Sequence, residues 1–387
     1  MKKDKIIKKS KGHSVQELMG IRRFTRYGLL TDEGETLFYL VSPINISVLS
    51  HANVEGKIVN LHKLFAAKPE LEFFCTDAAE CFDDNKAYLQ GRIEAEPNPA
   101  IQDLLKKDYQ FLDRMQVEMA TARQFFFIFR CKDMKESQVF QTANEVEKAI
   151  AGNGFEVRRL NRSEIKRLLA LYFDASLYGE HLPDMDGEQY LTVDTPEPVT
   201  SGRKRKEKPL TPEQAETIRT KDFFDCILPG TIKFQSDHYI VGNSYRSVWA
   251  LREYPPTTEE QAIFARLADR SGVTMRMYLR RVSDAERNKI INHAQRRNRM
   301  KSGSNDLQET VEAEGNLQDV IDMLMDLNRQ SEYLLHCAVF IELKAKTPEA
   351  LSNLQSEVNM ELLRSKLSVD RLLLRQKEGF LSVLPFG

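Results

Sequence analysis

Several motifs of common enzymes are missing from this chain of 387 residues. None of its 18 glycines begins the G-x-x-x-x-G-K-[ST] loop, whose backbone N–H groups and lysine bind nucleotide phosphates. The G-x-S-x-G turn of serine hydrolases and the H-E-x-x-H zinc helix are missing as well. The sequence therefore excludes a P-loop nucleotide hydrolase and these motif-based hydrolases, although an enzyme site assembled from scattered residues stays open.

Cysteine is rare and follows no pairing pattern. The chain has five cysteines, an odd number without a C-x-x-C motif: Cys75, Cys81, Cys131, Cys226 and Cys337. Two of them, Cys131 and Cys337, end or interrupt apolar runs, as cysteine does when it serves as a small buried side chain. This usage is typical of a reducing compartment, so we expect a cytoplasmic protein.

Long apolar runs and an excess of one charge are also missing. The run from Phe125 to Phe129 is short, and the run 334–343 includes His336 and Glu342, so neither predicts a membrane span. With 56 basic and 57 acidic residues the formal net charge is −1, and no overall field attracts nucleic acid or membrane. The lysine-rich residues 1–11 predict a solvated tail, with weak contact to anionic lipid as the alternative.

Residues 183–220 differ in composition from the rest of the chain. This segment has many prolines, few large apolar residues and a basic run that begins with Arg203, Lys204, Arg205 and Lys206. Such a composition predicts an exposed linker, with phosphate binding or a localisation signal as alternatives for the basic run. We therefore divide the chain into a basic tail (1–20), a first α/β module (21–182), the linker (183–220) and a second module (221–387).

The same order of expected elements occurs on both sides of this linker. Before it we expect strand 37–41, helix 50–67, strand 71–75, a helical stretch 83–121 broken at 97–99, strand 124–131, helix 137–151 and strand 155–160. After it we expect strand 247–252, helix 258–269, strand 273–282, a helical stretch 284–329 broken at 302–304, strand 333–343, helix 348–366 and strand 369–375. Corresponding elements lie roughly 200 to 215 residues apart, which indicates an internal repeat.

Each half then consists of β-α-β, a helical insertion and β-α-β, the split arrangement of ferredoxin-like folds. The expected class is α/β or α+β, with two ferredoxin-like halves that carry helical insertions. Two helix starts support this assignment: Thr257 and Glu260 have capping-box spacing, and Thr347 precedes Pro348. Fold alone does not determine activity, because such sheets host many unrelated functions.

Few residues indicate a site. Three acidic residues at 184–188 lack the glycine and glutamate positions of a calcium loop, and the seven histidines are dispersed. We therefore expect no catalytic, cofactor-binding or metal-binding residue. Arg296, Arg297 and Arg299, with Lys289 and Lys301, form a basic patch suited to nucleic acid or an acidic partner. The favoured interpretation is that a following acidic helix neutralises this patch (Glu309, Glu312, Glu314, Asp319, Asp322 and Asp326).

Two stretches of the second half are similar to a known family. The residues from Phe224 to Phe234, from Val241 to Tyr245 and from Trp249 to Pro255 resemble the opening of conjugative type IV secretion ATPases of the TraE/TrsE/TrbE/CagE kind. The resemblance continues through the segment 376–385, where Gln376, Phe380, Leu384 and Pro385 match the segment that precedes the motor domain of that family. It covers residues 220–387, and the first half resembles an extra N-terminal module of some Gram-positive conjugative-element members.

This resemblance implies a hexameric, peripheral membrane ATPase, whose N-terminal region docks on membrane subunits and whose C-terminal RecA-like motor hydrolyses ATP. The sequence ends at Gly387, before any position that matches the Walker residues or the arginine finger. We therefore expect a docking and assembly region that binds channel subunits and neighbouring protomers without hydrolysing ATP itself. ATP and Mg²⁺ are implied only for a motor domain that this chain lacks. The alternative is a stand-alone nucleic-acid-binding adaptor of a mobile element, which would use the two basic stretches.

Overall fold

The computed structural model describes residues 15–44, 48–77, 83–119, 123–175, 223–254, 264–301 and 334–387, with isolated positions at 315, 318, 320 and 321. The first half contains α1 (Val15–Met19), β1 (Ile21–Phe24), β2 (Leu29–Thr31), β3 (Gly34–Val41), α2 (His51–Ala67), β4 (Leu71–Asp77), α3 (Asp83–Ala95), α4 (Pro99–Met119), β5 (Arg123–Cys131), α5 (Glu136–Gly152), β6 (Val157–Arg159) and α6 (Arg162–Tyr172). The second half contains α8 (Phe223–Ile227), β7 (Ile232–Phe234), β8 (Tyr239–Val241), β9 (Ser244–Glu253), α9 (Ala265–Ala268), β10 (Val273–Arg281), α10 (Asp284–Lys301), β11 (Leu335–Ala345), α12 (Pro348–Arg364), β12 (Ser368–Asp370) and α13 (Gln376–Val383).

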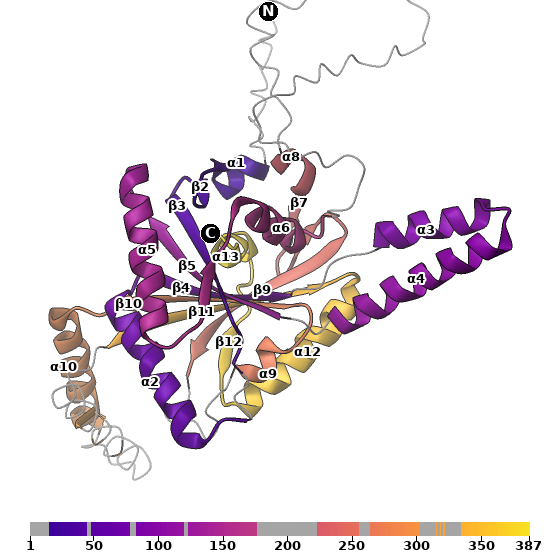
Figure 1. The fold of residues 1–387 in the computed structure, drawn as a ribbon. Helices are drawn as coiled ribbons and strands as arrows, with labels where there is room; N and C mark the ends of the chain where they lie inside the picture. The colour runs from indigo at the N-terminus through magenta and orange to yellow at the C-terminus, as the bar shows by residue number, and fades with distance from the viewer. Residues whose placement is uncertain are drawn as a thin grey trace, which may run out of the picture.

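The twelve described strands form one antiparallel sheet, so the fold is of the α+β class that the element order predicts (Figure 1). Within the first half the strands lie in the order β6-β3-β5-β4, and within the second half in the order β12-β9-β11-β10. A short hairpin precedes each set, β1-β2 in the first half and β7-β8 in the second. The two halves therefore have the same strand order.

The halves are joined edge to edge through β4 and β10. These strands pair antiparallel, with Phe74 opposite Arg276 and Cys75 opposite Met275. Because β4 and β10 are equivalent strands, the junction relates the two halves by an approximate two-fold rotation. The element order predicts the repeat but not this pairing, and the linker expected at 183–220 lies outside the described residues.

Helices cover both faces of the sheet and make three layers. Successive strand residues point to opposite faces, so Phe38 packs with α6 while Tyr39 packs with α5. Helices α2, α5, α9 and α12 cover one face, and α1, α6, α8 and α13 cover the other. The core between the sheet and α1, α6, α8 and α13 contains residues of both halves, so the two halves pack as one unit.

Local sequence explains several helix boundaries. The Thr347 side chain accepts a hydrogen bond from the Ala350 N–H and Pro348 follows it, which confirms the predicted start of α12. The predicted break at 97–99 is confirmed, since α3 ends at Ala95 and α4 begins at Pro99. The expected capping box at Thr257 lies outside the described residues, as do the break at 302–304 and most of the helix expected after it.

Two features near the ends of the halves differ from the prediction. The strand expected at 369–375 stops at Asp370, because Leu372 and Leu374 have positive φ angles of 49° and 62° that no strand accommodates. The residues after it form the helix α13, which the sequence did not predict. In the first half, the end of the segment predicted as a tail forms α1, and Met19 belongs to the core.

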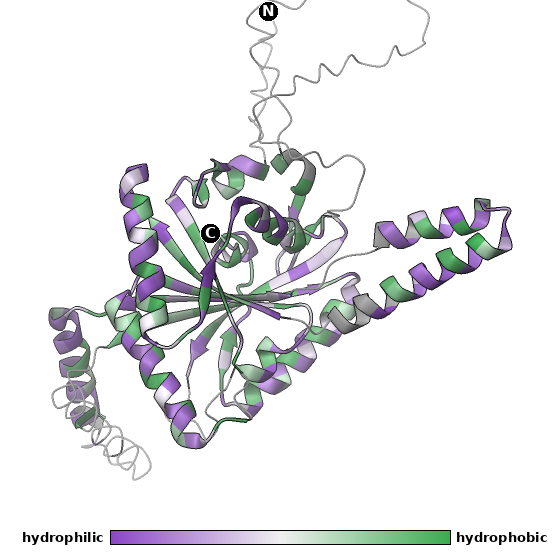
Figure 2. Ribbon diagram, viewed as in Figure 1, coloured by the Kyte–Doolittle hydropathy of each residue, from purple (hydrophilic) through white to green (hydrophobic). Residues whose placement is uncertain are grey.

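Two helical insertions project from the sheet at opposite ends (Figure 1). Helices α3 and α4, here called the arm, lie between β4 and β5 and pack against each other. Helix α10 lies between the equivalent strands β10 and β11. Figure 2 shows that α10 is hydrophilic over most of its length, whereas the arm has hydrophobic residues along both helices.

Candidate interaction site

The family-like segment, residues 376–385, forms α13 and the two residues after it. Gln376, Phe380, Leu384 and Pro385, the four positions that carry the resemblance, are all buried. The ring of Phe380 lies 5.3 Å from the ring of Tyr239, measured between centroids. The four positions predicted as a family-like segment therefore belong to the core of this chain.

Gln376 fills a gap in the sheet. Strand β8 pairs with β9 up to Arg246 and β12 pairs with it from Ala250 onward, which leaves the backbone of Val248 without a strand partner on that side. The Gln376 side chain accepts a hydrogen bond from the Val248 N–H at 2.9 Å and donates one to the Val248 carbonyl at 3.1 Å. A buried backbone group without a partner is costly, so this side chain stabilises the middle of β9.

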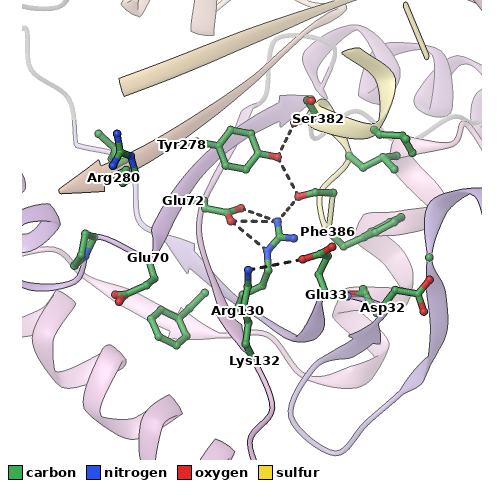
Figure 3. Close-up of a pocket in the computed structure, with 18 of the residues that line it drawn as sticks. Asp32, Glu33, Glu70, Glu72, Arg130, Lys132, Tyr278, Arg280, Ser382 and Phe386 are labelled. Carbon is green, nitrogen blue, oxygen red and sulfur yellow. Dashed lines mark hydrogen bonds and ion pairs between the residues drawn. The ribbon is translucent and has the colours of Figure 1, made fainter. Parts of the chain in front are cut away.

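Four side chains beyond α13 hold the rest of the family-like segment, and we call them the Arg276 cluster: Glu72, Arg130, Arg276 and Tyr278. Arg276 donates a hydrogen bond to the Pro385 carbonyl at 2.8 Å and pairs with Glu72. The Tyr278 hydroxyl donates to the Ser382 carbonyl at 2.7 Å, as Figure 3 shows.

Both halves contribute to this cluster. Glu72 and Arg130 come from β4 and β5, whereas Arg276 and Tyr278 come from β10. The Arg130 guanidinium lies 3.1 Å from the Glu72 carboxylate and also donates to the Gly387 carbonyl. The second half thus holds the family-like segment itself, and the first half holds Gly387, two residues after it.

Arg276 lies at the junction of the halves in a fully buried position. Its guanidinium is 5.6 Å from the ring centroid of Phe74, the residue opposite it, and 5.2 Å from that of Tyr278. Burial opposes its charge, yet the Glu72 carboxylate beside it raises the pKa of Arg276 above its ordinary value. The guanidinium therefore stays charged and needs the partners that surround it.

A second buried group, the Arg246 cluster, lies where the first half ends: Tyr172, Asp174, Tyr239, Arg246, Glu342 and Lys344. Arg246 lies 3.4 Å from Glu342 and donates a hydrogen bond to the Tyr172 carbonyl at 2.8 Å. The hydroxyls of Tyr172 and Tyr239 both donate to the Glu342 carboxylate. The cluster fastens the chain around residue 174, just before the expected linker, to strands of the second half.

Charges in this cluster determine how Asp174 titrates. Burial acts to raise the pKa of Asp174, but the adjacent Lys344 and Arg246 hold it below its usual value. The Lys344 ammonium is 2.8 Å from the Asp174 carboxylate. Burial, with the Glu342 carboxylate beside them, raises the pKa of both tyrosine hydroxyls well above the usual range. The two cations of the cluster, Arg246 and Lys344, therefore offset its two carboxylates, Asp174 and Glu342.

A groove of about 1190 Å³ lies beside the Arg276 cluster (Figure 3). It is bounded by α1, the β2-β3 turn, the ends of β5 and β10 and the family-like segment. Acidic and basic side chains line it together, and several pair with one another, such as Lys132 with Glu33 at 3.7 Å. Mixed, mutually paired charges give the groove no preference for anions or cations.

The interaction candidates from the sequence fall into two groups. Arg296, Arg297 and Arg299 are exposed residues of α10. Arg203, Lys204, Arg205 and Lys206 lie outside the described residues, and so do the acidic residues expected to neutralise the α10 patch, Glu309, Glu312, Glu314, Asp319, Asp322 and Asp326. The neutralising pair of insertion helices therefore stays a prediction.

Sequence reasoning missed the two buried clusters. Glu72 and Arg276 lie between apolar residues of their strands, Arg246 precedes an apolar run, and Glu342 interrupts one. A charged residue inside such a strand is the available signal, since buried charges occur only with partners. The partner itself is not readable, because Arg276 and Glu72 are separated by more than 200 positions.

Over the residues that the structure describes, no helix is long and apolar enough to cross a membrane, and no three His, Cys, Asp or Glu side chains gather as a metal site would require. Comparison with models of known protein families and with curated proteins returned no match for this chain.

Proposed function

We propose that this chain is a docking and assembly region of a conjugative type IV secretion ATPase of a mobile genetic element. In this role it binds membrane channel subunits and neighbouring protomers, peripherally on the inner face of the cell membrane. The supporting observation is the family-like segment, whose matching residues Gln376, Phe380, Leu384 and Pro385 are buried, with Phe380 and Leu384 in a core that contains residues of both halves. ATP and Mg²⁺ belong to a motor domain outside this chain.

An anchor of this kind suits a region that transmits movement. Arg276 and Tyr278 of the second half hold the segment, Arg130 of the first half holds Gly387 after it, and the bonds from the two arginines are charge-assisted. Charge-assisted hydrogen bonds to backbone carbonyls are strong and directional. A displacement of the segment after α13 would therefore move the two halves as one body.

The arm is the docking element that we infer for a channel subunit. Leu104 and Phe111 are 60% and 55% exposed on α4, and their spacing of seven places them on one side of the helix. Large apolar side chains on a projecting helix are typical of contact sites, where they pack into a groove of the partner. We expect the channel subunit to offer an apolar groove or helix face.

Co-purification from membranes of cells that carry the conjugative element tests this proposal. The chain should recover channel subunits, and the Leu104→Ser/Phe111→Ser variant should recover at least tenfold less. The matched control is Met360→Ser/Leu363→Ser, which changes two residues of α12 with 62% and 64% exposure and should recover as much as the unchanged chain. Recovery of no channel subunit by the unchanged chain would contradict the proposal, as would robust ATP hydrolysis by this chain alone.

A further inference from the structure

The exposed side of α10 carries a line of basic side chains. Ile291 is buried under the helix, and the residues near the opposite side are exposed, among them Lys289, Arg296 and Arg297. Positions 289, 293 and 297 recur every four residues, so Lys289, His293 and Arg297 lie above one another, with Arg296 beside them. Between 287 and 301 the helix has no acidic residue. The result is a continuous cationic ridge.

The acidic residues of α10 are already paired at its first turn. Asp284 lies 3.4 Å from Arg287, and Glu286 forms two hydrogen bonds with Arg280 at 2.8 and 3.0 Å. Among the described residues, Lys289, Arg296 and Arg297 have no ion pair. Their charge is therefore not cancelled by the first turn of the helix.

The equivalent insertion of the first half provides an internal comparison. The arm occupies the same place between strands, yet its two helices contain five basic and seven acidic residues, against six basic and two acidic in α10. An insertion at this place thus folds without a cationic surface. The position of α10 between two equivalent strands therefore does not by itself require its basic residues.

We propose that the ridge formed by Lys289, Arg296 and Arg297 binds the phosphate backbone of double-stranded DNA. Arginine offers planar donor pairs that match phosphate oxygens, and the major groove of the duplex is wide enough to admit a helix. The helix contains no Phe, Tyr or Trp, the large aromatic side chains on which the bases of a single strand stack best. Among the side chains of α10 that the structure describes, Ile290 alone is large, apolar and exposed, which is too little for insertion into a lipid surface.

The release of counterions from DNA determines how the affinity should depend on salt concentration. Three phosphate contacts give a slope of about −2.7 for log affinity against log salt concentration, and non-specific binding of this kind has a dissociation constant of about 10⁻⁴ to 10⁻⁶ M. The interaction depends on sequence weakly, because backbone contacts carry no base information. This inference is independent of the proposed docking function, since it needs neither a channel subunit nor ATP.

Fluorescence anisotropy with a labelled duplex, measured on the full chain across a salt series, tests the inference. Lys289→Ala/Arg296→Ala/Arg297→Ala should weaken binding at least tenfold and remove most of the salt slope. The matched control, Lys106→Ala/Lys107→Ala/Arg114→Ala, removes three exposed basic residues of α4 and should bind as the unchanged chain does. Circular dichroism should show both variants folded, because all six side chains are exposed.

Three results would overturn the inference. The first is an unchanged chain that does not bind the duplex at low salt, which would also favour neutralisation by the acidic residues after α10. The second is equal loss of binding in both triple variants. The third is a single strand of the same length, or vesicles of phosphatidylglycerol, bound more tightly than the duplex and lost in the α10 variant.

Discussion

Replacing Arg246 by methionine perturbs the most deeply buried ion pair of the structure's described part. The Arg246 side chain is fully buried and lies 3.4 Å from Glu342, whose side chain is 1% exposed. Methionine keeps much of the apolar stem of arginine but removes the charge. Glu342 would then be buried with only the hydroxyls of Tyr172 and Tyr239 as donors.

The expected loss follows from these contacts. Breaking a buried ion pair on one side costs about 3 to 5 kcal/mol, because the remaining charge has lost its partner. Asp174 adds little, since its partly buried carboxylate, 41% exposed, keeps Lys344 as a partner at 2.8 Å after Arg246 is replaced. The double variant Arg246→Met/Glu342→Leu leaves no uncompensated charge at these two positions, but it removes the acceptor of the Tyr172 and Tyr239 hydroxyls, so it should recover only part of the loss.

Urea unfolding followed by tryptophan fluorescence measures this directly. The chain has one tryptophan, Trp249, which is fully buried in the same strand as Arg246. The midpoint urea concentration should fall in the single variant at an unchanged slope. A loss below about 1 kcal/mol in Arg246→Met, or a double variant less stable than the single one, would refute the account of buried charge pairing.

Three further predictions concern the same core. Gln376→Ala should lower the free energy of unfolding by about 2 to 3 kcal/mol in a urea titration, because it leaves two backbone groups of Val248 without partners; a change within error would contradict the role of this side chain. Asp174→Asn should be less stable than the unchanged chain above pH 3.8, and the difference should vanish as pH falls through the lowered pKa of Asp174, with a pH-independent difference as the contrary result. Cys75 should resist a thiol reagent at pH 8 until urea unfolds the chain, because burial raises its pKa to about 11; rapid labelling of native Cys75 would contradict its burial.

The sequence predicts those parts of the fold that depend on local patterns. Apolar periodicity and turn residues locate the long strands and helices, and the Thr347 cap fixes the start of α12. The repeated element order predicts equal strand order in the halves. These features depend on residues close together in the chain, where propensity and capping act.

Contacts between distant residues are what the sequence does not reveal. The pairing of β4 with β10 joins strands about 200 positions apart, and either strand would satisfy its apolar pattern as a sheet edge. The strands of the hairpins β1-β2 and β7-β8 are too short to show a clear alternation of apolar and polar residues, so the sequence does not predict them. The anchoring of 376–387 depends on Arg276, whose role is defined only by partners that the fold brings to it.

The residues proposed to bind partners also divide into those that local sequence reveals and those that only the structure reveals. The α10 patch was readable because its basic residues are neighbours in the sequence. The docking side of the arm was not, because only the packing of α3 on α4 separates the partly buried apolar residues from the exposed Leu104 and Phe111. The exposed fraction of a side chain distinguishes a contact residue from a core residue, and only the structure gives that fraction.

Site-specific photo-crosslinking in cells that carry the conjugative element tests the docking proposal most directly. A photoreactive amino acid at Phe111, which is 55% exposed on the arm, is compared with one at Met360 of α12, which is 62% exposed. The account predicts that position 111 crosslinks to a channel subunit identified by mass spectrometry and that position 360 does not. Equal crosslinking at both positions, or no channel subunit at position 111 while the folded protein is present at the membrane, would contradict it.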